Sequence, residues 1–148
     1  MGWFGFIITD AVILAVICAV LYVIYNIIYH AVDTGKGIAV VSFIINVIAL
    51  IVLISNDQAP QITDGSFETG TVGVMAFSTI AVATAAVALF VTTNDGDDMG
   101  AGISESIGSS VILSAVATII QCFAESFWPM IVIVIIGILT CVLAWIKE

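Results

Sequence analysis

Five long apolar segments, separated by short polar connections, constrain this chain more than any other feature of its sequence. A helix needs about 20 residues to cross roughly 30 Å of hydrocarbon, and only helices or closed barrels can do so. The chain is 62% hydrophobic and only 9% charged, which is typical of an integral membrane protein. We therefore expect an all-α fold, a polytopic membrane helix bundle forming a single transmembrane domain over residues 1–148. Its helices are expected at about 11–31, 38–54, 71–92, 108–124 and 130–146.

The last two segments decide between five and four spans. One continuous helix over 108–146 would be about 60 Å long at 1.5 Å per residue, roughly twice the hydrocarbon thickness. Pro129 suits the first turn of a new helix, and Trp128 and Trp145 would then lie near opposite interfaces. Five transmembrane helices are expected, and the alternative is four, with a long last helix kinked at the proline.

The two lysines predict an orientation. With five spans, Lys36 and Lys147 lie on the same side of the membrane, whereas four spans would separate them. The positive-inside rule then places the N-terminus outside and the C-terminus inside.

The segment 108–124 is the only one with a continuous polar face. Its polar residues recur at steps of four, four, three and four, and they are Ser110, Ser114, Thr118, Gln121 and Glu125. At roughly 100° per residue they fall within an arc of about 80°. Hydrocarbon offers them no hydrogen-bond partner, so this polar stripe must face other helices, another copy of the chain, or water. It is either a helix-packing surface or the lining of a pore.

Two further sets of residues are candidates for contacts between helices. Asn46 lies near mid-membrane, and an interhelical polar face on 11–31 carries Tyr22, Asn26 and Tyr29. Segment 71–92 is rich in small residues, and its close-packing face is formed by Ser78, Ala81, Ala85 and Ala88. We expect that helix at the centre of the bundle or at a contact between subunits, and we expect Thr9 or Asp10 to cap the first helix.

The sequence carries no pattern that indicates catalysis, a cofactor or a metal site. It has one histidine and no arginine, and its three cysteines, Cys18, Cys122 and Cys141, lie within apolar runs without ligand spacing. Eleven acidic residues against two lysines give a net charge of −9, which argues against binding of nucleic acid. No small-molecule substrate is indicated.

The expected function is therefore that of a non-enzymatic structural membrane protein that self-associates into an ordered membrane assembly, of the virion-membrane or membrane-scaffold type. Its expected partners are the lipid bilayer, further copies of the chain, and other membrane or capsid proteins. The acidic connections resemble those of membrane proteins from salt-loving archaea and their viruses, a likeness of composition only. The alternative is a small oligomeric ion channel or transporter subunit, with the polar stripe along the path and Glu125 at its mouth.

Overall fold

Five long helices make up nearly all of the computed structural model, which describes residues 2–56, 62–63, 66–67, 69–93, 99–124 and 126–147. They are α1 (Trp3–Val32), α2 (Lys36–Ser55), α3 (Thr69–Thr93), α4 (Met99–Ala124) and α5 (Trp128–Lys147). Between α2 and α3, the two-residue strands β1 (Ile62–Thr63) and β2 (Ser66–Phe67) pair antiparallel. All five helices are long and apolar enough to cross a membrane. The expected all-α membrane bundle with five spans is confirmed.

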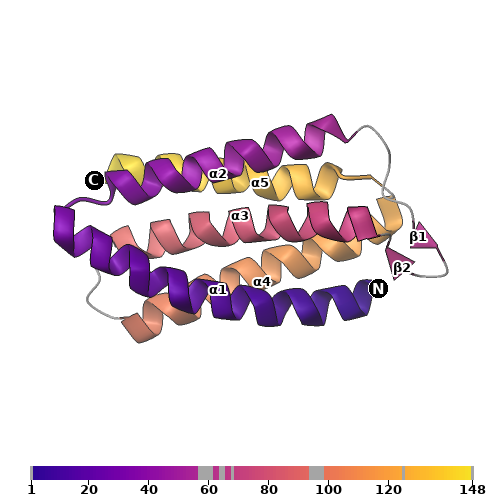
Figure 1. Ribbon diagram of the computed structural model, residues 1–148, viewed down its shortest axis with the longest axis horizontal. Coiled ribbons are helices and arrows are strands. Elements are labelled where there is room, and N and C mark those ends of the chain that lie inside the picture. Colours follow the sequence, from indigo (N-terminus) through magenta and orange to yellow (C-terminus); the bar gives the residue numbers. More distant parts are fainter. Residues whose placement is uncertain are drawn as a thin grey trace.

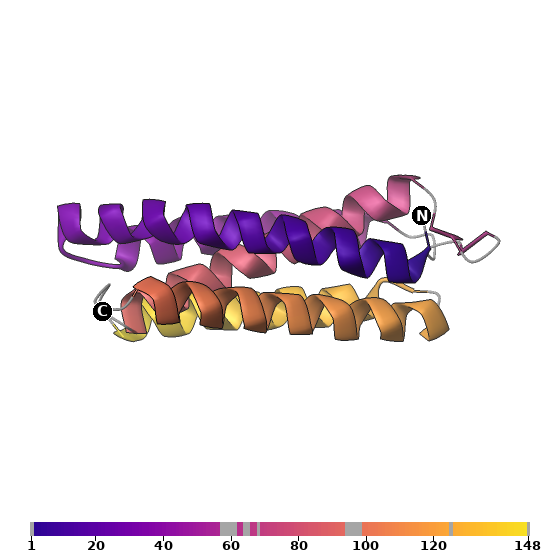
Figure 2. The same cartoon turned by 90° about the horizontal axis from the view of Figure 1, so that it is seen from below.

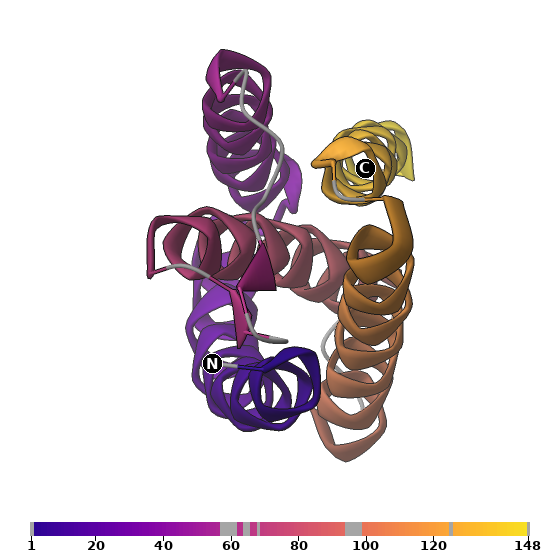
Figure 3. The same cartoon turned by 90° about the vertical axis from the view of Figure 1, so that its right-hand side faces the viewer.

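Helix α3 lies at the centre of the bundle. Figures 1 and 3 show α2 and α5 on one side of it and α1 and α4 on the other, and Figure 2 gives the view from below. Successive helices run in opposite directions, so the two ends of the chain lie at opposite ends of the bundle (Figure 1). The ring of Trp145 lies 5.1 Å from the Lys36 ammonium, which places the start of α2 beside the end of α5.

The central position of α3 follows from its small side chains. Its buried positions are mostly alanine, serine and threonine, including the predicted small-residue set Ser78, Ala81, Ala85 and Ala88. Small residues let helix backbones approach closely, and in lipid this close packing is a main source of helix association. A helix that is narrow nearly all round can therefore contact all four of the others.

The break between α4 and α5 lies where the sequence placed it. Helix α4 ends at Ala124, and α5 begins at Trp128 with Pro129 in its first turn. Proline fits there because the first amides of a helix have no intrahelical acceptor. The four-span alternative with a kinked final helix is therefore excluded.

Two helices begin earlier than expected. Helix α1 begins at Trp3 rather than at residue 11, and α4 begins at Met99 rather than at residue 108. Neither stretch contains proline, and polar residues such as Glu105 do not stop a helix that is packed against neighbours. Asp10 therefore does not cap α1 but lies inside it, two turns from its start, and is buried. The other three helices start only two residues before the expected 38, 71 and 130.

Five spans predict that the two ends of the chain are exposed on opposite sides of the membrane. We expect an epitope tag at the N-terminus and one at the C-terminus to be digested by protease from opposite sides of sealed vesicles. Digestion of both tags from the same side would contradict the five-span fold.

Candidate functional site

The polar stripe of α4 lies inside the bundle. Ser110, Ser114, Thr118 and Gln121 are all less than 5% exposed, whereas Glu125 lies outside the described residues. The buried face continues toward the start of α4 through Ser106 and Gly102. Small residues thus recur every fourth position from Gly102 to Ser114, which gives this side of α4 a low, partly polar surface.

Helix α1 of the same chain covers this surface. The contacts pair Asp10 with Ser114 and Cys18 with Ser110, so residue numbers increase along α1 as they decrease along α4. The Cys18 thiol lies 3.3 Å from the Ser110 hydroxyl, in an antiparallel contact between the two helices. Of the surroundings that the sequence allowed for the stripe, which were other helices, another copy of the chain or water, the structure places α1 of the same chain against Ser110 and Ser114.

At Gly102 the side chain of Tyr22 from α1 lies directly against the backbone of α4. A Cβ atom added there would overlap the hydroxyl of Tyr22, whose side chain is fully buried. Only glycine therefore leaves space for this tyrosine ring at the end of the polar stripe.

Asp10 is joined by hydrogen bonds to two other helices. Its carboxyl Oδ2 lies 2.5 Å from Ser114 Oγ on α4, and its Oδ1 lies 3.0 Å from Thr79 Oγ1 on α3. The Asp10 side chain is 2% exposed, and it is the only buried acidic residue in the described ranges. These ranges contain no salt bridge to Asp10, so two hydroxyl groups are the only partners found for this carboxyl group. A carboxyl group at this depth in a membrane bundle is the strongest candidate for a functional group in the chain.

The sequence contained a signal for the burial of Asp10. Asp10, Leu14, Cys18 and Tyr22 follow one another at steps of four and so lie on one face of a helix. The four residues form one helical face only if the helix begins before residue 10. The prediction that Asp10 caps the helix places it at a helix end, where this face does not include it.

A second group of polar side chains joins α2 to α1 and α3. Ser42 Oγ lies 2.9 Å from the Tyr25 hydroxyl of α1 and donates to the Thr84 carbonyl of α3 at 3.2 Å. The Asn46 amide donates to the Ser42 carbonyl at 2.8 Å and to the Ala81 carbonyl at 2.9 Å. Asn46, which the sequence predicted as an interhelical residue, therefore holds α2 against the central helix.

The carbonyl side of the Asn46 amide faces α5. A Cβ atom added at Gly137 would overlap Asn46 Oδ1 and would lie 3.6 Å from Cβ of Ala85. Glycine at this position of α5 therefore allows Asn46 to lie between α2, α3 and α5.

The remaining predicted polar residues lie along α1. Tyr22 is buried, Asn26 is 9% exposed, and Tyr29 is half-buried with its ring edge-to-face against the ring of His30. Three amide side chains are buried without full hydrogen bonding in the described part of the chain. The Oδ1 atoms of Asn26 and Asn46 have no partner there, and neither Nε2 nor Oε1 of Gln121 has one.

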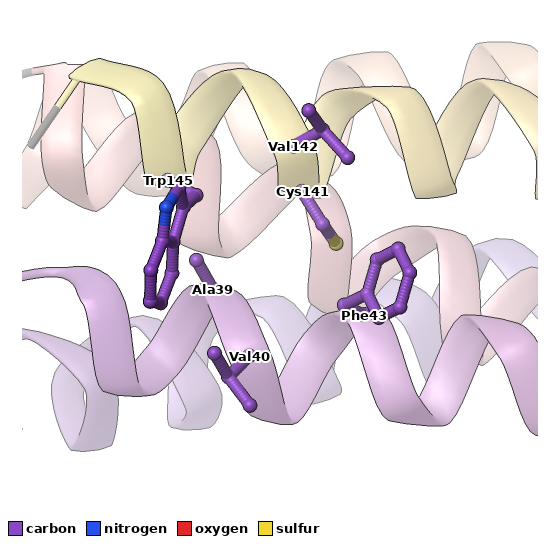
Figure 4. A pocket seen from close by; sticks show the side chains of 6 residues that line it. All are labelled: Ala39, Val40, Phe43, Cys141, Val142 and Trp145. Atoms are coloured by element: carbon purple, nitrogen blue, oxygen red, sulfur yellow. The ribbon is translucent and has the colours of Figure 1, made fainter.

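An apolar groove of about 270 Å³ lies between α2 and α5 (Figure 4). Its lining is formed by Ala39, Val40, Phe43, Cys141, Val142 and Trp145. Since the lining side chains are almost entirely apolar, the groove suits a hydrocarbon chain, and the Cys141 thiol is the only nucleophilic group in its lining. The polar site of the molecule is therefore the contact of α1 with α3 and α4 rather than this groove.

The chain belongs, by fold, to the polytopic helical membrane proteins. It matches no protein-family model, and no curated protein or solved structure shows significant similarity to it. No group of three or more histidine, cysteine or acidic side chains placed to hold a metal ion occurs within the described ranges.

The contacts of Asp10 predict how substitutions act on stability. We expect Asp10→Leu to lower the free energy of unfolding by about 1–3 kcal/mol, because the Ser114 hydroxyl loses its buried acceptor. Asp10→Asn should cost less, since the amide can still accept from Ser114 and donate to Thr79. Unfolding in detergent micelles measures both, and Glu105→Leu, at an exposed site on α4, is the matched control. Equal stability of Asp10→Leu and Glu105→Leu would contradict this role.

The close approach of α5 to Asn46 predicts a specific effect of one added methyl group. We expect Gly137→Ala to destabilise the bundle by about 1–3 kcal/mol, because the methyl group overlaps the Asn46 amide. Gly108→Ala on α4 is the control, since no atom lies within 4 Å of the added Cβ. There, the better helix propensity of alanine should stabilise by up to about 1 kcal/mol. Thermal unfolding of both variants compares them, and an unchanged Gly137→Ala variant would refute the packing argument.

Proposed function

We propose that the protein is a non-enzymatic structural integral membrane protein whose copies associate into an ordered membrane assembly. The observation that carries this proposal is the location of its polar side chains. They join helix to helix inside a single copy, as in the contacts of Asp10 and Asn46. The polar side chains of each copy are thus used within that copy, and its outer surface is apolar. Such a surface suits copies that pack side by side in a bilayer.

The apolar side chains on the outer surface support this proposal. Four of the five helices expose large apolar side chains along their length, among them Phe4, Val12, Ile27, Ile44, Ile51, Ile112, Phe123, Leu139 and Ile146. In lipid, contacts between such surfaces depend on van der Waals packing, because there is no water to drive association. We propose that copies meet through these faces, in a virion membrane or a membrane scaffold.

A non-enzymatic role is supported by the sequence. One histidine and two lysines, with no arginine, leave few of the groups that serve as bases, nucleophile activators or oxyanion-binding cations. The acidic composition supports an origin in a salt-loving archaeon or its virus, and the positions of Lys36 and Lys147 support an outside N-terminus. Origin and orientation are both part of the proposal.

A second candidate function, an oligomeric ion channel or transporter subunit, is favoured by Asp10. Ionisable side chains within membrane spans commonly mark ion or proton pathways. The polar stripe itself is covered by α1, so conduction along it would require α1 to separate from α4. The closed contact between these helices favours the structural role.

Reconstitution into liposomes distinguishes the two functions. For a structural protein we expect chemical crosslinking to give species larger than dimers, while the liposomes stay impermeable to small cations. Thr118→Leu and Asp10→Asn should leave this impermeability unchanged. Cation flux in the wild type that is lost in both variants would establish the channel, and monomers without flux would refute both proposals.

A further inference from the structure

The hydroxyl of Thr79 has two acceptors within reach but only one hydrogen. Its Oγ1 lies 2.9 Å from the Ala76 carbonyl of the same helix and 3.0 Å from Asp10 Oδ1. Serine and threonine in helices commonly donate to the carbonyl three or four residues earlier. The same bond is made at eight other described positions in the spans: Ser78, Thr84, Thr92, Ser106, Ser109, Ser110, Thr118 and Thr140.

If Thr79 donates to Ala76, its contact with Asp10 needs a hydrogen from the carboxyl group. A carboxylic acid supplies it: the Asp10 O–H donates to Thr79 Oγ1, and the Ser114 hydroxyl donates to the other carboxyl oxygen. Every hydroxyl then donates once, and no net charge is buried. An ionised carboxylate would bury an uncompensated negative charge among apolar helices. The free-energy cost of taking that charge out of water is far larger than the stabilisation from hydrogen bonds with two hydroxyl groups.

No described positive group faces this carboxyl from the helices packed around it. Helix α3 has no titratable side chain, and those of α4 are Glu105, which is exposed, and the half-buried Cys122. On α1 the nearest in sequence is Cys18, followed by Tyr22, Tyr25 and Tyr29, and the exposed His30 lies about 30 Å away along the helix. Lys36 and Lys147 belong to helix ends at the opposite end of the bundle (Figure 1).

Gln121 lies between this site and the nearer end of the bundle. It follows Ser114 by two turns on the same face of α4, is fully buried, and has no hydrogen-bond partner for either amide atom within the described ranges. A buried amide with unused donors and acceptors is a place where an ordered water is expected. Gln121 therefore provides a polar site about 10 Å from Ser114, in the direction of the bundle end where α1 begins.

We propose that Asp10, Thr79 and Ser114 form a proton-binding site that exchanges with the membrane side of the N-terminus through water held at Gln121. On exchange, the carboxyl O–H bond breaks, the proton passes to water, and a proton from water replaces it. This site is independent of whether copies of the chain associate.

Infrared spectroscopy of the full chain in lipid tests the proposal. At neutral pH we expect a carbonyl band of a protonated, buried carboxyl group in the wild type, absent in Asp10→Asn and unchanged in Glu105→Gln. Aspartate labelled with heavy carbon at the carboxyl should shift this band, which keeps the test valid if Asp10→Asn fails to fold. A folded wild type without the band, or a folded Asp10→Asn that retains it, would overturn the proposal.

Exchange in heavy water tests the route. The deuterium shift of the band should be several-fold slower in Gln121→Leu, because the water site is lost. Asn26→Leu is the matched control, since it removes a buried amide with an unpartnered oxygen about 24 Å farther along α1. Unchanged exchange in Gln121→Leu, or equal slowing in Asn26→Leu, would refute exchange through Gln121.

Discussion

The absence of water from the bilayer core is the constraint on which the rest of this structure depends. A buried hydroxyl or amide group that cannot reach water must find its partner within the protein. Most hydroxyl groups of the spans donate to a carbonyl of their own helix, as Thr84, Thr118 and Thr140 do. These residues are thereby satisfied without a neighbour, so few polar side chains are left to join one helix to another.

The side chains that do join helices lie on different sides of α3. Asn46 and Ser42 hold α2 against it through backbone carbonyls, and Asp10 joins it to α1 and α4 through Thr79 and Ser114. Apolar packing alone gives lipid-embedded helices little reason to prefer one rotation over another, because lipid is as apolar as leucine. Polar contacts at fixed positions select one arrangement of the five helices around the central one.

The sequence predicted the features that depend on length and local periodicity. Five spans followed from the hydrocarbon thickness, the restart at Pro129 from the chemistry of the first helical turn, and the polar stripe from residue spacing. Periodicity shows that Ser110 and Ser114 share a face but does not show which helix covers it. Which helix covers this face depends on how the Tyr22 ring fits against Gly102, and these two residues lie in different segments of the sequence. Helices α1 and α4 begin earlier than predicted, because polar residues such as Asp10 and Glu105 do not end a helix that packs against neighbours.

A carboxyl group is a costly way to connect three membrane helices. Asparagine or serine at position 10 could donate to Thr79 or accept from Ser114 without the cost of a group that can become charged. Asn46 performs this kind of connection on the other side of α3 with an amide alone. What an aspartic acid adds to the same hydrogen bonds is a proton that can leave and return. The site at Asp10 is thus better explained by that exchange than by stability alone, and this holds whether the bundle is a structural block or part of a conducting assembly.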